Sequence, residues 1–179
     1  MKIHLFTQVL AATILLGSLP PHTSNAAPAE GTRVSFVFVE PEKFTDKRYS
    51  EAERYSAAIP LQLQRFIVET GAASLPEPLR LEIRITDIDM AGDFELFRGP
   101  VRVQVRVIKG IYPPRIAIEF RVIDAAEQSV AVGKRNLIDI DYQRRVVYPP
   151  DDSLRYEKDL LRDWLRAELA SLKIGKTPY

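Results

Sequence analysis

The stretch from Leu79 to Gly92 constrains the fold more than any other part of this sequence. Its first half alternates strictly between apolar and polar residues, the period of a β-strand with one buried and one solvated face. The apolar positions are Leu79, Leu81, Ile83 and Ile85. After Thr86 the alternation changes phase, because Asp87 and Asp89 now occupy the positions where buried residues are expected. Either a β-bulge turns the strand over here, or two carboxylates point into the core.

Four other segments are predicted to be strands. Arg33–Val39 carries apolar residues on both parities, which predicts a central strand covered on both faces. Alternation of apolar and polar residues predicts three more strands, at Val101–Val107, Ile116–Ile123 and about Val130–Tyr142. Glycine and proline in Ala91–Pro100 predict a loop.

Two helices are expected. Ser50–Glu53 matches a capping box, and an apolar stripe runs from there to about Thr70, where Gly71 is expected to end the helix. Pro60 either kinks this helix, which we favour, or marks the start of its main part. Asp152 or Ser153 is expected to cap a second amphipathic helix. The order predicts an α+β fold: a mostly antiparallel five-stranded sheet (strand–helix–four-strand meander–helix) with both helices on one face.

The N-terminus predicts export. Lys2 precedes an apolar run of about 15 residues, shorter than a spanning helix needs, and Ser24-Asn25-Ala26 is a small-x-small cleavage pattern. An uncleaved anchor is the alternative. We therefore expect a signal peptide at 1–26, a flexible lead-in at 27–32, a single α+β domain at 33–173 and a C-terminal tail at 174–179. A periplasmic location follows, without lipid attachment because the chain has no cysteine.

Cleavage of the signal peptide removes the only histidines of the chain and with them several common catalytic mechanisms. Both histidines, His4 and His22, lie in the signal segment, so the mature chain has neither His nor Cys. Histidine-based triads, cysteine nucleophiles and His/Cys zinc sites are thereby excluded. Of 25 Lys and Arg only Lys2 is removed, which leaves 24 against 24 Asp and Glu. A neutral balance argues against nucleic acid as a partner. No integral membrane segment is expected after cleavage.

A repeated tripeptide is the candidate metal site. Asp87-Ile88-Asp89 recurs as Asp139-Ile140-Asp141, and alternation places both carboxylates of each copy on one strand face, roughly 6.6 Å apart. If the two strands were neighbours, four carboxylates would converge, and Ca or Mg would be the natural ligand because hard cations prefer oxygen donors. The alternative is that these aspartates cap turns or pair with arginine. No other cofactor is predicted.

Other side chains form a candidate binding surface. Lys43 and Asp46 flank an aromatic loop residue, and Tyr112 precedes two prolines that stiffen its turn. Arg102, Arg106 and Arg121, joined by Arg80 and Arg84, are candidates for a basic row on the outer face of the sheet. Interleaved glutamates favour a mutually neutralised solvated face as the alternative.

Four ordered motifs carry a family resemblance. Val39–Asp46, Thr86–Gly92, Leu137–Tyr142 and Leu154–Trp164 resemble domain-of-unknown-function family 3016, exported proteins of Gram-negative bacteria. Met90 stands where the family usually has leucine. The resemblance implies an envelope location and leaves the function open.

The sequence thus favours a non-enzymatic binding or accessory protein of the cell envelope, with an envelope protein, peptidoglycan or lipid as partner. The alternative is a carboxylate-based or divalent-metal-dependent hydrolase acting on envelope glycan or phosphate substrates. A purely structural envelope component is a third reading. Oligomeric state does not follow from the sequence.

Overall fold

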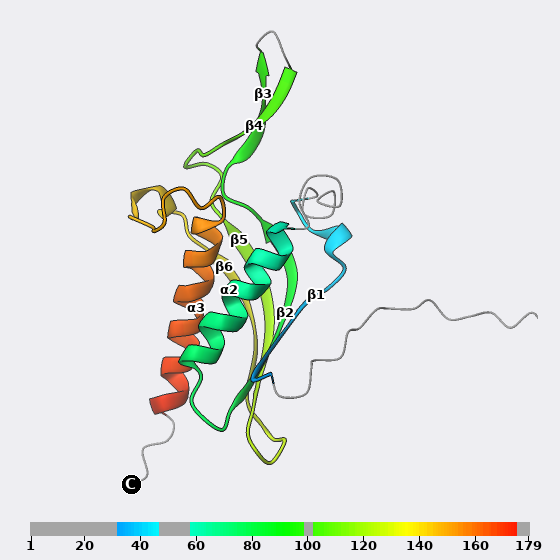
Figure 1. Cartoon of the computed structure of the whole chain (residues 1–179), viewed down its shortest axis with the longest axis vertical. Helices are drawn as coiled ribbons and strands as arrows, with labels where there is room; N and C mark the ends of the chain where they lie inside the picture. The colour runs from blue at the N-terminus through cyan, green and yellow to red at the C-terminus, as the bar shows by residue number, and fades with distance from the viewer. Residues whose placement is uncertain (1–31, 47–57, 99–101, 175–179) are drawn as a thin grey trace, which may run out of the picture.

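The computed structural model describes residues 32–46, 58–98 and 102–174. Its main sheet has four strands in the order β1-β2-β5-β6, and a separate hairpin is formed by β3 and β4 (Figure 1). The strands are β1 (Val34–Phe38), β2 (Arg80–Asp89), β3 (Asp93–Arg98), β4 (Arg102–Val107), β5 (Arg115–Ile123) and β6 (Ser129–Ile138). The helical elements are η1 (Pro41–Lys43), α2 (Ala58–Ser74), η2 (Tyr142–Arg144) and α3 (Arg155–Ile174). The predicted α+β class is confirmed.

The predicted five-stranded sheet is wrong in two respects. First, β1 pairs in parallel with β2, so the sheet is mixed, and β1 lies at the edge of the described sheet instead of its centre. A parallel neighbour needs a crossover connection, and α2 lies on that connection. Second, β4 leaves the sheet to pair with β3, and β5 takes the place beside β2. The loop predicted at Ala91–Pro100 therefore contains a strand.

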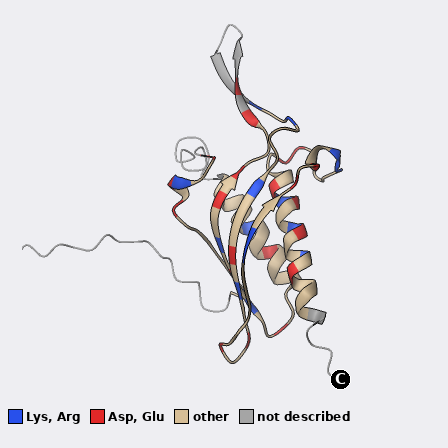
Figure 2. Cartoon of the chain, turned by 180° about the vertical axis from the view of Figure 1, so that it is seen from behind, with Lys and Arg blue, Asp and Glu red and all other residues tan. Residues whose placement is uncertain are grey.

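Both helices cover the same face of the sheet, as predicted (Figure 1). From behind, the strands lie in front of the helices, and no described element covers their outer face (Figure 2). The core is filled from the inner positions of β2 and β5 and from the apolar stripes of the helices. Its central members include Leu81, Ile83, Ile85, Ile116, Ile118, Leu63, Ile67, Leu161 and Leu165.

A β-bulge resolves the anomaly in β2. The register with β5 shifts between Ile85 and Asp87, so that Asp87 lies opposite Ala117. The extra residue returns Ile88, which is 1% exposed, to the buried face and moves Asp87 and Asp89 to the outer one. Of the two alternatives, the bulge is correct. It costs one unpaired residue, whereas two carboxylates in the core would each lose their hydration.

The end of α2 differs from the prediction. The helix continues beyond Gly71 to Ser74. Gly71 instead allows α2 to pack closely against β1, because a Cβ at this position would lie 3.2 Å from Cγ2 of Val34. Pro60 is the third residue of the part of α2 that the structure describes. The expected capping box at 50–53 and any kink before Ala58 lie outside the described residues.

Candidate functional site

Most of the predicted site residues meet at one end of the sheet. The strand ends converge there, because Phe38 pairs with Ile85, Asp89 with Arg115, and Arg115 in turn with Ile138. We call this end the upper rim, since it lies uppermost in Figure 1. It comprises residues 40–46, 86–93, 106–115 and 138–153 and the first turns of α3.

Asp87 fastens the η1 segment to the bulge. Its carboxylate accepts hydrogen bonds from the backbone N–H of Thr45 at 2.6 Å and from the Thr45 hydroxyl at 2.7 Å. The next backbone N–H, that of Asp46, donates to the carbonyl of Ile88 at 2.9 Å, and Asp46 is itself buried. Lys43 in the same segment is exposed and pairs with Glu40 at 2.5 Å. The bulge thus gives Asp87 a structural role.

Asp89 is the rim carboxylate with a perturbed protonation equilibrium. Partial burial raises its pKa above the ordinary aspartate value, and Arg115 on β5 opposes that shift. The carboxylates of Asp46, Asp87 and Asp93 raise the pKa further. Partial burial and neighbouring carboxylates thus act together against ionisation of Asp89.

The second Asp-Ile-Asp motif is neutralised by arginine. Asp139 lies 3.1 Å from Nη1 of Arg145, and the other terminal nitrogen of that guanidinium lies 2.9 Å from Asp159 and 2.6 Å from Asp163 on α3. Asp141 is more exposed, 3.4 Å from Arg144. For Asp139, the structure therefore agrees with the alternative to a metal site, in which the aspartate pairs with arginine.

The two motifs lie two strands apart. Asp89 is opposite Arg115, which is opposite Ile138, so β5 separates the motifs by roughly 10 Å of backbone. Within the described residues, no group of three or more carboxylates is placed so that it would hold a metal ion. The guanidinium of Arg145 lies instead where three carboxylates meet, and it already supplies the positive charge there.

A buried ion pair joins the rim to α3, and sequence reasoning missed it. Glu157 is fully buried and accepts hydrogen bonds from the Ala91 N–H at 2.7 Å and from Nη2 of Arg106 at 2.8 Å. Arg106 also donates to the carbonyls of Ala91 at 2.6 Å and Ser153 at 2.8 Å. Arg106 therefore holds the hairpin base to α3 and lies off the outer sheet face where it was expected. The signal available in the sequence was a glutamate in the first turn of an otherwise apolar helix face.

Two rim loops are bonded to each other. The hydroxyl of Tyr142 donates to the Lys109 carbonyl at 2.7 Å, and Nε2 of Gln143 donates to the Ile108 carbonyl at 3.1 Å. Burial raises the pKa of Tyr142, which keeps this hydroxyl a donor. In the 108–114 loop, Tyr112 is half-buried and its neighbour Ile111 is 74% exposed.

The outer face of the sheet is a ladder of opposite charges. Glu119 lies between Arg84 at 3.5 Å and Lys134 at 2.5 Å, and Glu82 pairs with Arg121 at 2.8 Å. Blue and red positions are interspersed along the strands in Figure 2. The outer face is therefore a mutually neutralised solvated surface, the alternative to the expected basic row. Arg102 belongs to the hairpin, outside this sheet.

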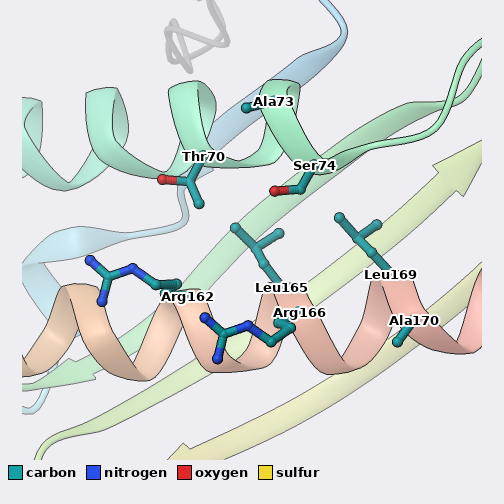
Figure 3. Close-up of a pocket in the computed structure, with 8 residues that line it drawn as sticks. All are labelled: Thr70, Ala73, Ser74, Arg162, Leu165, Arg166, Leu169 and Ala170. Atoms are coloured by element: carbon teal, nitrogen blue, oxygen red, sulfur yellow. The ribbon is translucent and has the colours of Figure 1, made fainter.

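A groove of about 510 Å³ runs between α2 and α3 (Figure 3). Leu165 and Leu169 point from α3 towards α2, opposite Thr70 and Ser74. Arg162 flanks the groove, but its guanidinium pairs with Asp159 at 2.7 Å and lies 5.2 Å from the ring centroid of Phe66. Arg166 also lines the groove and lies 3.4 Å from Asp163, so both arginines at this seam between the helices have a carboxylate partner.

Comparison with known proteins places the chain in a family. No curated protein matches it. Among solved structures it is similar to a minor lipoprotein from Acinetobacter baumannii, with 8% identity and a TM-score of 0.29, over 82% of this chain and 97% of that chain. A TM-score of this size carries no argument about fold or function. Neither described α-helix has the length and apolar composition needed to cross a membrane. The family model described as "Protein of unknown function (DUF3016)" matches residues 32–167, which includes every described strand and most of α3, and the chain belongs to that family.

Proposed function

We propose that the protein is a non-enzymatic binding or accessory protein of the cell envelope, and that it contacts its partner through the upper rim. One observation carries the proposal: the rim exposes four large apolar side chains on its loops. They are Ile111, Ile140, Val146 and Tyr148, with 70–81% of their surface accessible. Apolar side chains gathered at one end of a molecule are typical of interaction sites.

The polar groups of the rim support the same proposal, because most of them are used to hold it in shape. Asp87 holds Thr45, Glu157 holds Arg106 and Ala91, and Asp139 pairs with Arg145. Bonds from Tyr142 and Gln143 fix the loop that carries Ile111. A rigid apolar surface loses little conformational entropy when it binds a partner.

The test is capture from envelope extract by the immobilised mature chain. We expect at least one protein, glycan or lipid component to be enriched by the wild type and lost with Ile111→Ser/Val146→Ser. Val132→Ser is the matched control, because Val132 is 74% exposed on β6, outside the rim. Equal enrichment by all three chains, or none, would refute the proposal.

The alternative is a carboxylate-based hydrolase, favoured by the raised pKa of Asp89 beside Asp87. Glycoside hydrolysis requires a proton-donating carboxyl group, whose pKa is raised, and a nearby carboxylate. This reading predicts release of soluble glycan from purified peptidoglycan by the wild type and loss of that release in Asp89→Asn. A metal-dependent version further predicts that millimolar Ca²⁺ or Mg²⁺ raises the melting temperature. No release and no shift would exclude both.

A further inference from the structure

Strand β6 forms one edge of the main sheet. It pairs with β5 on one side, and among the described residues no strand pairs with its other side. Natural sheets usually keep their edge strands short or interrupt them with proline or a bulge. β6 has ten residues without proline, and its register with β5 is unbroken from Ala131 to Ile138. The free side is therefore a regular row of backbone groups with which another strand can pair.

The hydrogen-bond pattern shows which residues of β6 offer their backbone to the free side. The N–H of Asp139 donates to the Pro114 carbonyl at 3.4 Å, directly after the opposed pair of Ile138 and Arg115. Hydrogen-bonded pairs alternate along an antiparallel ladder, so the odd-numbered residues of β6 bond to β5. The even-numbered residues point their N–H and C=O groups away from β5; these are Val130, Val132, Lys134, Asn136 and Ile138.

Two valines add apolar surface to the free edge. Val132 is 74% exposed and Val130 is 45% exposed. Both point to the outer face of the sheet, as does Lys134 at the same parity, which pairs with Glu119 there. Opposed apolar side chains stabilise a pair of strands. These valines therefore favour a partner strand that also exposes apolar side chains.

The cations of β6 do not require an acidic partner. Lys134 pairs with Glu119 at 2.5 Å, and Arg135 pairs with Glu168 on α3 at 2.9 Å. Arg135 also donates to the Lys134 carbonyl at 3.0 Å, which agrees with the outward direction of that carbonyl. Charge thus selects neither an acidic nor a basic strand. The edge fits a regular strand with exposed valines and matched charges, and β6 of a second copy is such a strand.

We propose that two copies of the chain pair through their β6 strands, antiparallel and with the two-fold axis at Val132. In this register Val132 opposes its counterpart, Val130 of each copy opposes Lys134 of the other, and the pairing extends over residues 129–135. Opposed residues share a face, so the helices of both copies lie on the same side of one continuous sheet. The interface contains none of the four exposed side chains of the rim, so the inference goes beyond the proposed function.

Charge separation selects this register over its neighbours. An axis at Lys134 would oppose two lysines directly, and like charges at opposed positions are destabilising. An axis at Gly133 would place the two lysines two residues apart along the strands. The axis at Val132 places them four residues apart, roughly 13 Å, and brings the exposed Val132 side chains together.

The helix beside β6 leaves room for the second copy. α3 packs against β6 and α2 against β1, so the pairing brings the two α3 helices towards each other. Leu165 and Leu169 point towards α2 (Figure 3), and Ala167 and Ser171, two residues further along, lie on the opposite flank and are exposed. The flank of α3 that approaches its counterpart therefore carries small side chains.

Sedimentation equilibrium of the mature chain measures the association. We expect a monomer–dimer equilibrium at roughly 100 µM chain, since an interface of one strand per copy is smaller than a standard one. Val132→Pro removes one outward N–H from each copy and no bond to β5, so it is expected to weaken the dimer about 30-fold, at about fivefold per hydrogen bond. Ile138→Pro is the matched control, because Ile138 is also even-numbered but lies outside the paired residues, and it is expected to change the association less than about twofold.

A disulfide tests the register independently, and it decides the question even if a proline variant does not fold. The chain has no cysteine, so a single Val132→Cys reports on one position. Opposed residues in a hydrogen-bonded pair have Cα atoms about 5.5 Å apart, within reach of a disulfide. Val132→Cys is expected to give a covalent dimer on mild oxidation. Ile138→Cys, about 40 Å from its counterpart in this register, is not.

A chain that stays monomeric and forms no disulfide at Val132→Cys would overturn the inference. Equal weakening by the two prolines, or equal cross-linking by the two cysteines, would overturn it as well, because the copies would then meet elsewhere. Amide protection of β6 that appears in hydrogen exchange only after envelope extract is added would assign the edge to a strand of another protein and overturn the second copy.

Discussion

Replacing Glu157 by alanine is expected to destabilise the fold by about 4 kcal/mol. Its carboxylate is fully buried and lies 2.8 Å from Arg106, whose side chain is only 15% exposed. Breaking a buried ion pair from one side costs about 3 to 5 kcal/mol, because the remaining charge stays buried without a partner. The buried N–H of Ala91 also loses its acceptor, which costs about 1 to 3 kcal/mol. Because Arg106 is partly solvated, the total loss in the free energy of unfolding should lie towards the lower end of the combined range.

Urea denaturation of the mature chain, followed by circular dichroism, measures this loss. In a separate thermal scan, the melting temperature should fall by roughly 8 to 16 °C, at about 2 to 4 °C per kcal/mol for a domain of this size. Glu119→Ala is the control, because Glu119 makes its two ion pairs on the solvated sheet face, where losing them should cost far less than losing the buried pair.

Two further variants test the reasoning. Glu157→Gln keeps an acceptor for Ala91 and should cost less than Glu157→Ala. Arg106→Met/Glu157→Leu removes both buried charges and should recover part of the loss. A cost for Glu157→Ala no larger than that for Glu119→Ala would show that the ion pair does not hold the rim to α3.

Three other changes test the rim. Asp87→Ala removes two hydrogen bonds to Thr45 and should cost about 2 kcal/mol in urea denaturation; a cost below about 0.5 kcal/mol would contradict the assigned tether. Asp89→Asn should raise the melting temperature at pH 7 and not at pH 3: the folded-state pKa of Asp89 is raised, so its ionised form opposes folding above that pKa, and the penalty vanishes as pH falls through it. An equal gain at both values would show that the effect is not ionisation. Gly92→Ala should cost about 3 kcal/mol, since φ is +79° and a Cβ would lie 2.5 Å from the Val107 carbonyl oxygen; a neutral result would mean that the hairpin base adjusts freely.

The bulge shows what local pattern predicts well. The phase slip after Thr86 restricted β2 to two outcomes, and the known cost of burying carboxylates favoured the one that the structure has. The pattern of apolar residues likewise placed five of the six strands to within a few residues, and the apolar stripe located α3. These features depend on neighbours along the chain, which the sequence contains directly.

Strand partners were predicted less well. The alternation of apolar and polar residues in β4 predicts a strand but does not indicate which strand pairs with it. β3 was predicted to be a loop because it lies between Gly92 and Gly99. β1 was expected at the centre because both its faces are apolar, yet Val37 and Val39 stay half-exposed at the edge. Pairing depends on the length and path of the connections, which periodicity does not encode.

The sequence by itself determined the absence of histidine and cysteine from any mature chain cleaved after Ala26, and the family through its ordered motifs. It also limited the phase slip in β2 to a bulge or two buried carboxylates, and the cost of burying unpaired charge favours the bulge. Only the tertiary structure decided that Glu157 would meet Arg106, 51 residues away, and that Arg145 would meet three carboxylates. Only it separated the two Asp-Ile-Asp motifs by a strand and left the hairpin outside the sheet. Such contacts join distant segments, and their energies depend on burial that exists only once the chain has folded.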